Sequence, residues 1–398
     1  MPSHPSRVIV ISEHYAPSTG ATAQLLDDLC TGLVERGIDI TVITSTRPSE
    51  KESRHISPRV VRISPPTLAR TNLLAKTLSG VYFSVASLVW LLLKAPQYSK
   101  VLIVSNPPFI AVNGLLLFLL RRISYFFLLQ DLFPRSAELA GILPNGGPIS
   151  AYWRNLIRLS CLCSSTVIVL SHSMRQRSML EYKLPKSKFV VINNWAVEHA
   201  NNISKRDNPI AKAWGLTEIF TVQYSGNFGR LHDIMTILEA ARLLSSQPIQ
   251  FLFVGGGQKY QQILDYKQHF SLENISLHPY QSRSMLPTSL GACDISAVGL
   301  VPGSEDTVAP SKFYGILASG KPVLLIGSAK SEIAFQIKSY NCGLVIEPGD
   351  SPALSIELTK LVKSPELLIT MAHNALKLYK DNYGYSRSID KYHSLLNN

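Results

Sequence analysis

Short apolar runs alternate with longer stretches of helical spacing along the chain. In the first half the runs are RVIVIS (7–12), IDITVIT (38–44), VLIVS (101–105) and ISYFFLL (123–129). Uninterrupted apolar runs of this length are typical of parallel strands covered on both faces. Between the first two runs, Leu25, Leu26, Leu29 and Leu33 repeat with helical period, and Gly37 ends the stretch. This order predicts β-α-β units and an α/β fold.

The second half repeats the alternation after a polar interval. Residues 193–209, NNWAVEHANNISKRDNP, have no hydrophobic period and predict a linker. Beyond it, strands are expected at FTVQY (220–224), FLFV (251–254), PVLLI (322–326) and LVI (344–346). The pattern therefore predicts two α/β domains, residues 1–200 and 201–375.

One stretch of the second domain combines helical pattern with candidate chemistry. VPGSEDTVAP (301–310) is a polar loop, and Phe313, Ile316 and Leu317 then mark one helical face. Ser311 and Lys312 occupy the first turn, where unpaired N–H groups favour phosphate. A lysine there opposes the helix dipole, which favours a ligand role. An ordinary surface loop with polar caps remains the alternative.

A glycine turn follows the first strand of this domain. Gly226, Asn227, Gly229 and Arg230 line it, and backbone N–H groups together with Arg230 are suited to a diphosphate. Gly256, in the run of three glycines at 255–257, permits close approach of a nucleotide or of another backbone. Such turns also occur without a ligand.

The first domain offers two further candidates. Gly20 ends a polar loop after the first strand, which is suited either to phosphate approach or to an ordinary turn. Asp131 stands just past the strand at 123–129, where ligands of parallel sheets bind. Its alternative role is a helix N-cap. His172, between two serines, is expected in an ordinary capped turn.

Charge and cysteine usage limit the class of protein. The chain has 398 residues and a net charge of +12, which suits polyanionic partners. No basic run interleaved with aromatic residues supports nucleic-acid binding. Five scattered cysteines without zinc spacing favour free thiols in a reducing compartment. The first residues lack the pattern of a secretion signal, so we expect a cytoplasmic protein.

Residues 77–93, TLSGVYFSVASLVWLLL, are uncharged and flanked by Lys76 and Lys94. The run is at the lower edge of the roughly 17–25 residues needed to span a bilayer. A second uncharged run, 101–120, is interrupted by Pro107 and Pro108. These runs predict either helices that lie against anionic lipid, or buried helices of the domain.

Four segments, in order, resemble glycosyltransferase family 4. The opening loop around Gly20, DLFPRSA (131–137), YSGNFGR (224–230) and APSKFYGILASGKPV (309–323) are similar to motifs of its bacterial colanic-acid and O-antigen enzymes. The resemblance implies the GT-B architecture, two Rossmann-like domains facing a central cleft. It implies an acceptor-side first domain, a nucleotide-sugar-binding second domain, and a last helix, 376–398, that crosses back to the first.

The resemblance also implies the reaction. We expect a hexosyl- or N-acetylhexosaminyltransferase that uses a nucleotide diphosphate sugar, retains configuration and needs no metal. The acceptor would be a saccharide, polyprenyl-linked, at the inner face of the plasma membrane. Asp131, Lys312 and Arg230 are the predicted catalytic residues. The predicted donor-binding residues, with Tyr280 nearest the base, are Gly20, Gly226, Asn227, Gly229, Gly256, Tyr280, Glu305 and Ser311.

The chain departs from the family pattern at several positions. Thr307 and Gly315 stand where many members carry two glutamates, and Arg135 replaces another glutamate. Asn227 and His232 stand where broader family members have arginine and lysine. The missing glutamates and the replacement at Asn227 keep a non-catalytic membrane scaffold open as an alternative. The shared architecture keeps a second one open, a nucleotide-sugar epimerase of the same fold.

Overall fold

The computed structural model describes residues 7–18, 20–47, 58–65, 73–196 and 204–397. The chain divides into two compact units. Unit 1 comprises Met1–Asn194, Thr307–Ala309 and Ser386–Asn398, and unit 2 comprises Trp195–Asp306 and Pro310–Tyr385. The division falls after Asn194 rather than at residue 200. Residues 197–203 of the predicted linker lie outside the described part.

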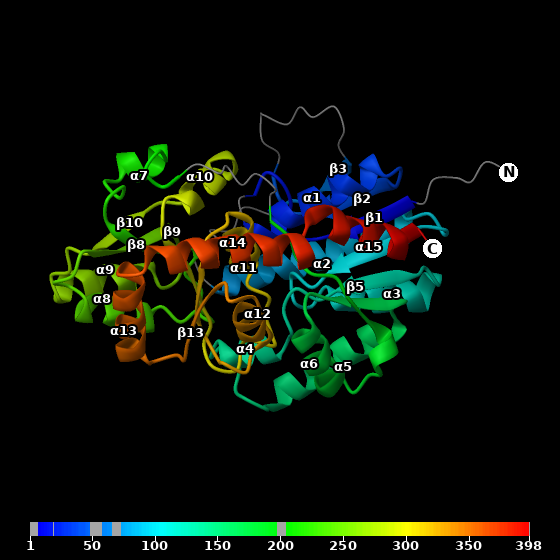
Figure 1. The fold of residues 1–398 in the computed structure, drawn as a ribbon. Coiled ribbons are helices and arrows are strands. Elements are labelled where there is room, and N and C mark those ends of the chain that lie inside the picture. The colour runs from blue at the N-terminus through cyan, green and yellow to red at the C-terminus, as the bar shows by residue number, and fades with distance from the viewer. Residues whose placement is uncertain (1–6, 19, 48–57, 66–72, 197–203, 398) are drawn as a thin grey trace. The chain divides into compact units, whose positions relative to one another are not determined.

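Unit 1 is built on a parallel sheet of seven strands (Figure 1). Their spatial order is β3-β2-β1-β4-β5-β6-β7. The four apolar runs named in this half of the sequence form β1 (Arg7–Ile11), β2 (Asp39–Thr44), β4 (Lys100–Val104) and β5 (Tyr125–Leu128), as predicted. The other strands are β3 (Arg59–Arg62), β6 (Thr166–Val169) and β7 (Phe189–Val191).

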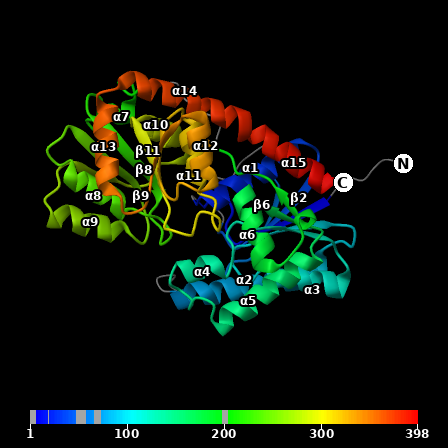
Figure 2. The same cartoon turned by 60° about the horizontal axis from the view of Figure 1, so that its bottom comes forward.

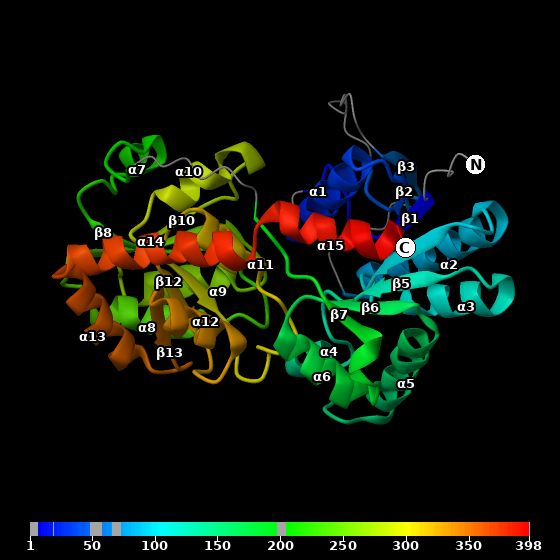
Figure 3. The same ribbon diagram turned by 45° about the vertical axis from the view of Figure 1, so that its right-hand side comes forward.

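Helices cover both faces of this sheet. They are α1 (Ala21–Glu35), α2 (Leu73–Lys94), α3 (Ala111–Arg121), α4 (Arg135–Leu139), α5 (Pro148–Cys163), α6 (His172–Tyr182) and α15 (Tyr385–Asn397). The crossover through α1 runs toward the β3 edge, whereas those through α2, α3, α5 and α6 run toward the β7 edge. Because crossovers are right-handed, α1 lies on one face and these four on the other. Figures 2 and 3 show α2, α3 and α5 together on that face.

Unit 2 is built on a parallel sheet of six strands, in the order β10-β9-β8-β11-β12-β13. Its core contains alternate side chains of the central strands, such as Val222, Tyr224, Phe251 and Phe253. The strands are β8 (Phe220–Asn227), β9 (Ile249–Gly256), β10 (Ile275–His278), β11 (Ile295–Gly299), β12 (Val323–Ile326) and β13 (Gly343–Ile346).

The helices of unit 2 include several that were not predicted from the sequence. They are α7 (Pro209–Ala213), α8 (Met235–Leu243), α9 (Tyr260–His269), α10 (Leu286–Gly291), α11 (Ser311–Ala318), α12 (Glu332–Tyr340), α13 (Ser351–Val362) and α14 (Pro365–Asn382). Helix α9 escaped prediction because Ile263 is its one buried residue, so it shows no apolar stripe.

The C-terminal region differs from the single last helix, 376–398, that the resemblance implies. Helix α14 ends at Asn382 and α15 begins at Tyr385, so Tyr383 and Gly384 interrupt the helix. Helix α15 packs in unit 1, where Ser388 Oγ donates to Asn193 O (2.9 Å) and Arg36 pairs with Asp390 (2.9 Å). Pro310, the last residue of the predicted polar loop, is the N-cap of α11.

Candidate active site

The order of strands in unit 2 selects one edge of its sheet. The chain proceeds outward from β8 through β9 to β10, then returns and proceeds from β11 to β13 in the opposite direction. The switch point therefore lies between β8 and β11. Ligands of doubly wound sheets bind beyond the carboxyl ends of the strands at such a point. Asn227 ends β8, and the segment after β11 leads to Lys312.

The glycines at this edge allow two chain segments to approach closely. Gly226 pairs with Gly255, and Asn227 with Gly256, along the β8–β9 register. A Cβ on Gly255 would lie 2.1 Å from Gly226 O, and one on Gly257 would lie 2.4 Å from Asn227 Oδ1. Both glycines also have positive φ, of +137° and +135°. No other residue fits these positions, so the glycine run fixes the shape of the turn.

Lys312 extends from the first turn of α11 over this glycine turn. Its Nζ donates a hydrogen bond to Asn227 O (3.2 Å) and lies 3.8 Å from the centre of the Tyr224 ring. A Cβ on Gly226 would lie 3.6 Å from Lys312 Cε, so the absent side chain makes room for the lysine. Burial lowers the pKa of Lys312 to about 7. The ammonium group is thus held over an aromatic face, and its positive charge is only partly compensated there.

His232 lies beside the same turn. Its Nδ1 is 2.8 Å from Asn227 O and 3.1 Å from the backbone N of Gly229. Burial, and next the charge of Lys312, lower the pKa of His232 to about 3. The imidazole therefore stays neutral at physiological pH and braces the turn without adding charge.

The structure distinguishes the two predicted sources of N–H donors, the glycine turn and the first turn of α11. The N–H groups of Phe228 and Gly229 in the glycine turn donate inside the protein, to Gly256 O (2.7 Å) and to His232 Nδ1. Helix α11 has no side-chain cap at Pro310. The N–H groups of Ser311 and Lys312 in its first turn are therefore the better candidate for an anion site.

The other predicted donor residues of unit 2 are spread around this edge. Tyr280 is exposed and its hydroxyl donates to Gly256 O (3.0 Å), which places it beside the glycine run. Arg230 is exposed and its Nε donates to Gln258 Oε1 (2.9 Å). Glu305 Oε1 accepts from the backbone N of Ser328 (3.2 Å). Ser311 is the first residue of α11.

In unit 1, the two predicted residues occupy different loops of the sheet. Gly20 is the N-cap of α1 and has ordinary extended backbone, φ −65°. Asp131 follows β5, pairs through its backbone with Val308, and does not cap α4, whose N-cap is Pro134. Burial raises the pKa of Asp131 to about 6. The N-cap interpretation of Asp131 is therefore wrong.

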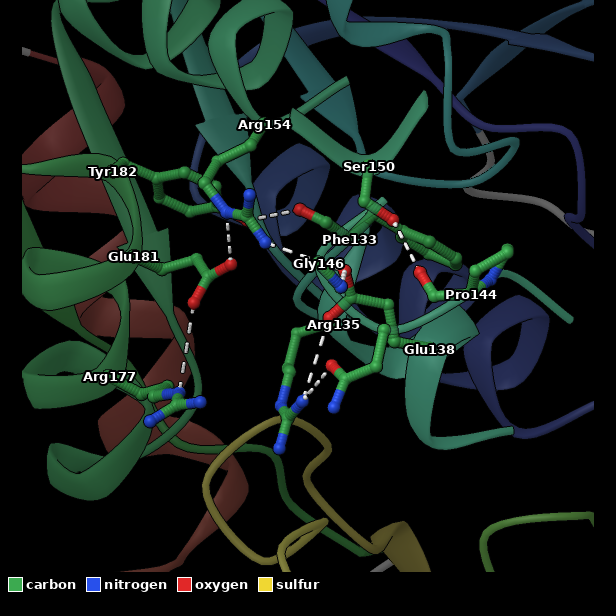
Figure 4. Close-up of polar contacts among 11 residues, drawn as sticks. Phe133, Arg135, Glu138, Pro144, Gly146, Ser150, Arg154, Arg177, Glu181 and Tyr182 are labelled. Atoms are coloured by element: carbon green, nitrogen blue, oxygen red, sulfur yellow. Dashed lines mark hydrogen bonds and ion pairs between the residues drawn. The ribbon is translucent and has the colours of Figure 1, made fainter. Parts of the chain in front are cut away.

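An ion-pair network supports the chain that follows Asp131 (Figure 4). Arg154 of α5 bonds to Glu181 of α6 (2.5 Å) and lies 3.5 Å from Glu138 of α4. Arg135 lies 3.6 Å from Glu138 and donates to Asn145 Oδ1 (2.9 Å). Arg135, which replaces the family glutamate, thus pairs with a carboxylate one turn later. The network links three helices behind the loop.

Two contacts tie the loop itself to these helices. Tyr182 is buried and its hydroxyl donates to Phe133 O (2.8 Å). The Phe133 ring stacks on Trp153 with centroids 5.8 Å apart. Together with the ion pairs, these contacts restrict the conformation of the chain from Leu132 to Arg135.

Sequence reasoning missed the partners of the predicted residues. These partners are Tyr224, Arg154 and Glu181. They lie within helices or strands and belong to no sequence motif that indicates a binding or catalytic role. The one usable signal is the spacing in YSGN, which brings Tyr224 two residues before Gly226. His172, by contrast, follows Ser171, whose Oγ accepts from Met174 N (3.0 Å), as expected of a capped turn.

An open hollow of about 840 Å³ lies elsewhere in unit 1, between β7 and α15. It contains none of the predicted site residues. Its lining consists of Val190, Val191, Arg387, Asp390, Lys391, Ser394 and Leu395. All five cysteines are free thiols, as predicted.

Comparison with known families agrees with the fold and the motifs. Residues 22–196 match the model described as Glycosyltransferase Family 4, and residues 210–378 match the model Glycosyl transferases group 1. The two matches cover most of both units. The chain therefore combines a Glycosyltransferase Family 4 domain with a Glycosyl transferases group 1 domain. Its fold is GT-B, and its activity is that of a glycosyltransferase.

Two curated relatives are bacterial enzymes. This glycosyltransferase is 24% identical over 395 residues to "Probable glycosyltransferase WbjE" of Pseudomonas aeruginosa, covering 97% of this chain and 96% of that one. Over 146 residues it is 29% identical to "Putative colanic acid biosynthesis glycosyl transferase WcaI" of Escherichia coli (strain K12), covering 36% of each.

Solved structures share the fold at low sequence identity. Sucrose-phosphate synthase of Thermosynechococcus elongatus superposes with a TM-score of 0.77, at 16% identity, over 98% of both chains. Anabaena HepE in complex with UDP-glucose gives 0.74 at 14% identity, over 98% of this chain and 99% of that one. WaaG, a glycosyltransferase of lipopolysaccharide biosynthesis, gives 0.74 with the same identity and coverage.

Proposed function

We propose that this glycosyltransferase moves a sugar from a nucleotide diphosphate donor to a lipid-linked saccharide in cell-surface polysaccharide synthesis. The transfer retains anomeric configuration, needs no metal, and takes place at the inner face of the plasma membrane. The relative WcaI, named for colanic acid biosynthesis, supports a role in polysaccharide synthesis, and WbjE supports glycosyl transfer. The HepE complex with UDP-glucose supports a nucleotide-sugar donor.

The position of Lys312 carries the proposal. During transfer, the bond between the anomeric carbon and the diphosphate oxygen breaks, and negative charge develops on the leaving diphosphate. A cation is most useful where that charge appears. Lys312 places its ammonium group at the N-terminus of α11, beside the switch point of the sheet. Both the lysine and the helix terminus then stabilise the leaving group.

The protonation of Lys312 is coupled to the donor. Its pKa of about 7 leaves the free enzyme partly uncharged near neutrality. A bound diphosphate favours the charged form and raises that pKa again. The lysine is therefore fully charged when the donor is bound. Charge stabilisation of this kind supplies the electrostatic function that a divalent cation serves in other transferases.

Asp131 is the proposed acceptor-side residue in unit 1. It follows β5, next to the strand at the switch point between β1 and β4. Its pKa of about 6 leaves the carboxylate mostly charged at neutral pH and able to accept a hydrogen bond from an acceptor hydroxyl. The ion-pair network of Figure 4 holds the loop that follows it.

The test is a transfer assay with a panel of UDP- and GDP-sugars. The acceptor is a polyprenyl diphosphate saccharide or its water-soluble short-chain analogue. We expect one nucleotide class to give a mass-shifted acceptor and free nucleotide diphosphate, in the presence of a chelator. Nuclear magnetic resonance of the product should show the anomeric configuration of the donor.

Four results would contradict the proposal in different ways. An epimerised sugar nucleotide formed without acceptor would identify an epimerase. An inverted anomer would exclude retention, and loss of turnover with chelator would exclude metal-free transfer. Absence of donor binding as well as turnover would favour a non-catalytic scaffold.

A further inference from the structure

Helix α2 exposes a continuous apolar stripe. Leu74, Leu78, Val85, Val89 and Leu93 recur every three to four residues or multiples of that spacing, with Val81 and Tyr82 between them. Their exposed fractions range from 43% to 72%. Residues spaced in this way share one face of a helix. A stripe of this length on a water-facing helix is unusual for a soluble protein surface.

The opposite face of α2 is packed into unit 1. Phe83 and Leu91 are fully buried there. Asn113 of α3 donates through Nδ2 to Ser84 O (2.8 Å) and to Ser87 Oγ (3.0 Å). By length and composition α2 is the one described helix able to cross a membrane. Because one face of α2 is packed against the domain, the helix instead fits one that lies on the domain with its other side exposed.

Helices α3 and α5 lie in the same layer as α2 (Figure 2). Their exposed residues continue its apolar surface. Helix α3 adds Leu119 and Leu120 at its C-terminal end. Helix α5 adds Ile149, Tyr152, Leu159 and Leu162, all exposed. We call the exposed apolar residues of α2, α3 and α5 the apolar layer. It extends over three neighbouring helices on one face of the sheet.

The charged residues of these helices are all basic. Helices α2, α3 and α5 have 22, 11 and 16 residues, and none contains Asp or Glu. Exposed basic residues border the apolar layer: Lys76 and Lys94 near the ends of α2, Arg122 just after α3, and Arg158 beside Leu159 on α5. An apolar surface rimmed by cations matches the interface of an anionic bilayer.

We propose that the apolar layer docks on the surface of an anionic phospholipid bilayer, with α2 lying in the plane of the interface. Where it concerns access to a lipid-linked acceptor, this rests on the proposed function. Docking places unit 1, which carries Asp131, at the surface where such an acceptor is anchored. Tyr82 and Tyr152 suit the headgroup level, because each has an apolar ring and a polar tip.

The same features disfavour a second copy of the chain as the occupant. Two apolar layers brought face to face would oppose Lys76, Lys94, Arg122 and Arg158 with like charges. Helices α2, α3 and α5 offer no carboxylate to compensate them. Anionic headgroups supply the compensation that a second copy lacks.

The experiment is cosedimentation of the full chain with vesicles. One set contains phosphatidylethanolamine and phosphatidylglycerol, and the other contains phosphatidylcholine alone. We expect binding to the anionic set and weaker, salt-insensitive binding to the neutral set. The double substitution Leu78→Glu with Val85→Glu should weaken binding by ~10-fold or more, since it places two carboxylates in the layer. Lys94→Gln with Arg158→Gln should reduce anionic binding by roughly 10-fold and weaken its salt dependence, since Lys76 and Arg122 remain.

A matched control lies in unit 2. Ile356 on α13 and Ile369 on α14 are exposed to 56% and 71%. The double substitution Ile356→Glu with Ile369→Glu adds the same charge outside the apolar layer and should leave vesicle binding unchanged. For every variant, UDP and GDP binding and the unfolding temperature are measured, to show that the fold is retained.

Each outcome decides the proposal. Equal weakening by the two double glutamate variants, or no binding of the unmodified chain to anionic vesicles, would overturn it. Self-association in solution that Leu78→Glu with Val85→Glu abolishes would identify a second copy instead. Transfer to a water-soluble acceptor is measured in parallel. If the unmodified chain shows no such transfer, the proposed function is refuted and docking is unaffected. If a variant no longer binds vesicles but keeps this transfer, the apolar layer serves docking and not the chemistry.

Discussion

At the scale of single residues, the ammonium group of Lys312 brings together contacts that lie far apart in the sequence. It meets Asn227 O and the Tyr224 ring, both of β8, although the lysine itself is in α11. The sequence predicted Lys312, Gly226 and Gly256, because a lysine in a first helical turn and glycines after a strand are locally unusual. It did not predict Tyr224, because a buried tyrosine in a strand is locally ordinary.

The pKa of Lys312 leads to a prediction about pH. Burial lowers it to about 7, and a bound diphosphate raises it, so binding takes up a proton. The contribution of Lys312 to UDP or GDP affinity should be constant well below that pKa. It should fall by up to ~10-fold per pH unit as pH rises through it.

The measurement is the ratio of wild-type to Lys312→Met affinity across pH. Taking the ratio removes the ionisation of the nucleotide phosphate, which both proteins share. A ratio that does not change between pH values on either side of 7 would show that Lys312 does not bind the diphosphate.

Gly255 gives a prediction about packing at the same edge. A methyl group there would lie 2.1 Å from Gly226 O at a positive φ of +137°. Gly255→Ala should lower the free energy of unfolding by about 3 kcal/mol or more, from clash and backbone strain together. The measurement is urea unfolding of the full chain, monitored with a spectroscopic probe placed in unit 2.

Gly349→Ala is the matched control for backbone strain alone. Its φ is +88°, and a Cβ there meets nothing within 4 Å. We expect a loss of only about 1–2 kcal/mol. Equal losses in the two variants would mean that the close approach of β8 and β9 is not what requires glycine.

At the scale of elements, the strands were predictable and the supporting contacts were not. Buried parallel strands need apolar side chains on both faces, so all the runs named from the sequence became strands. The network behind Asp131 depends on Arg154 and Glu181 meeting across α5 and α6, 27 residues apart. No local pattern encodes such a pair, since it requires the packing of two helices.

That network predicts a stability difference between two arginines. Arg154→Met removes the cation that faces Glu138, whose side chain is 2% exposed, and Glu181, which is 10% exposed. Because Arg154 is itself partly exposed, we expect a loss of roughly 2–3 kcal/mol, below the value for a fully buried pair. Chemical denaturation of the full chain measures it.

Arg206→Met is the control, because Arg206 pairs with Glu218 at 3.2 Å with both side chains largely exposed. It should cost less than ~1 kcal/mol. A loss for Arg154→Met no larger than this would show that the network does not stabilise the loop after Asp131.

At the scale of the whole molecule, two doubly wound units and their order along the chain followed from pattern and resemblance. The placement of residues 386–398 in unit 1 followed from resemblance alone, since amphipathic spacing does not specify which domain a helix joins. The apolar run at 77–93 left membrane and core readings open. The structure shows that the helix combines a packed face with an exposed one, which hydropathy along a sequence cannot separate.

The most direct test of the central claim is calorimetric titration of UDP and GDP into the full chain, Lys312→Ala and the control Lys338→Ala. Lys338 is an exposed lysine of α12. The account predicts that one nucleotide binds and that Lys312→Ala raises its Kd by ~10-fold or more, because hydrogen bonds to charged groups contribute about 1.5–3 kcal/mol. Lys338→Ala should leave Kd unchanged. Binding of neither nucleotide, or equal affinity in Lys312→Ala and the unmodified chain, would contradict it.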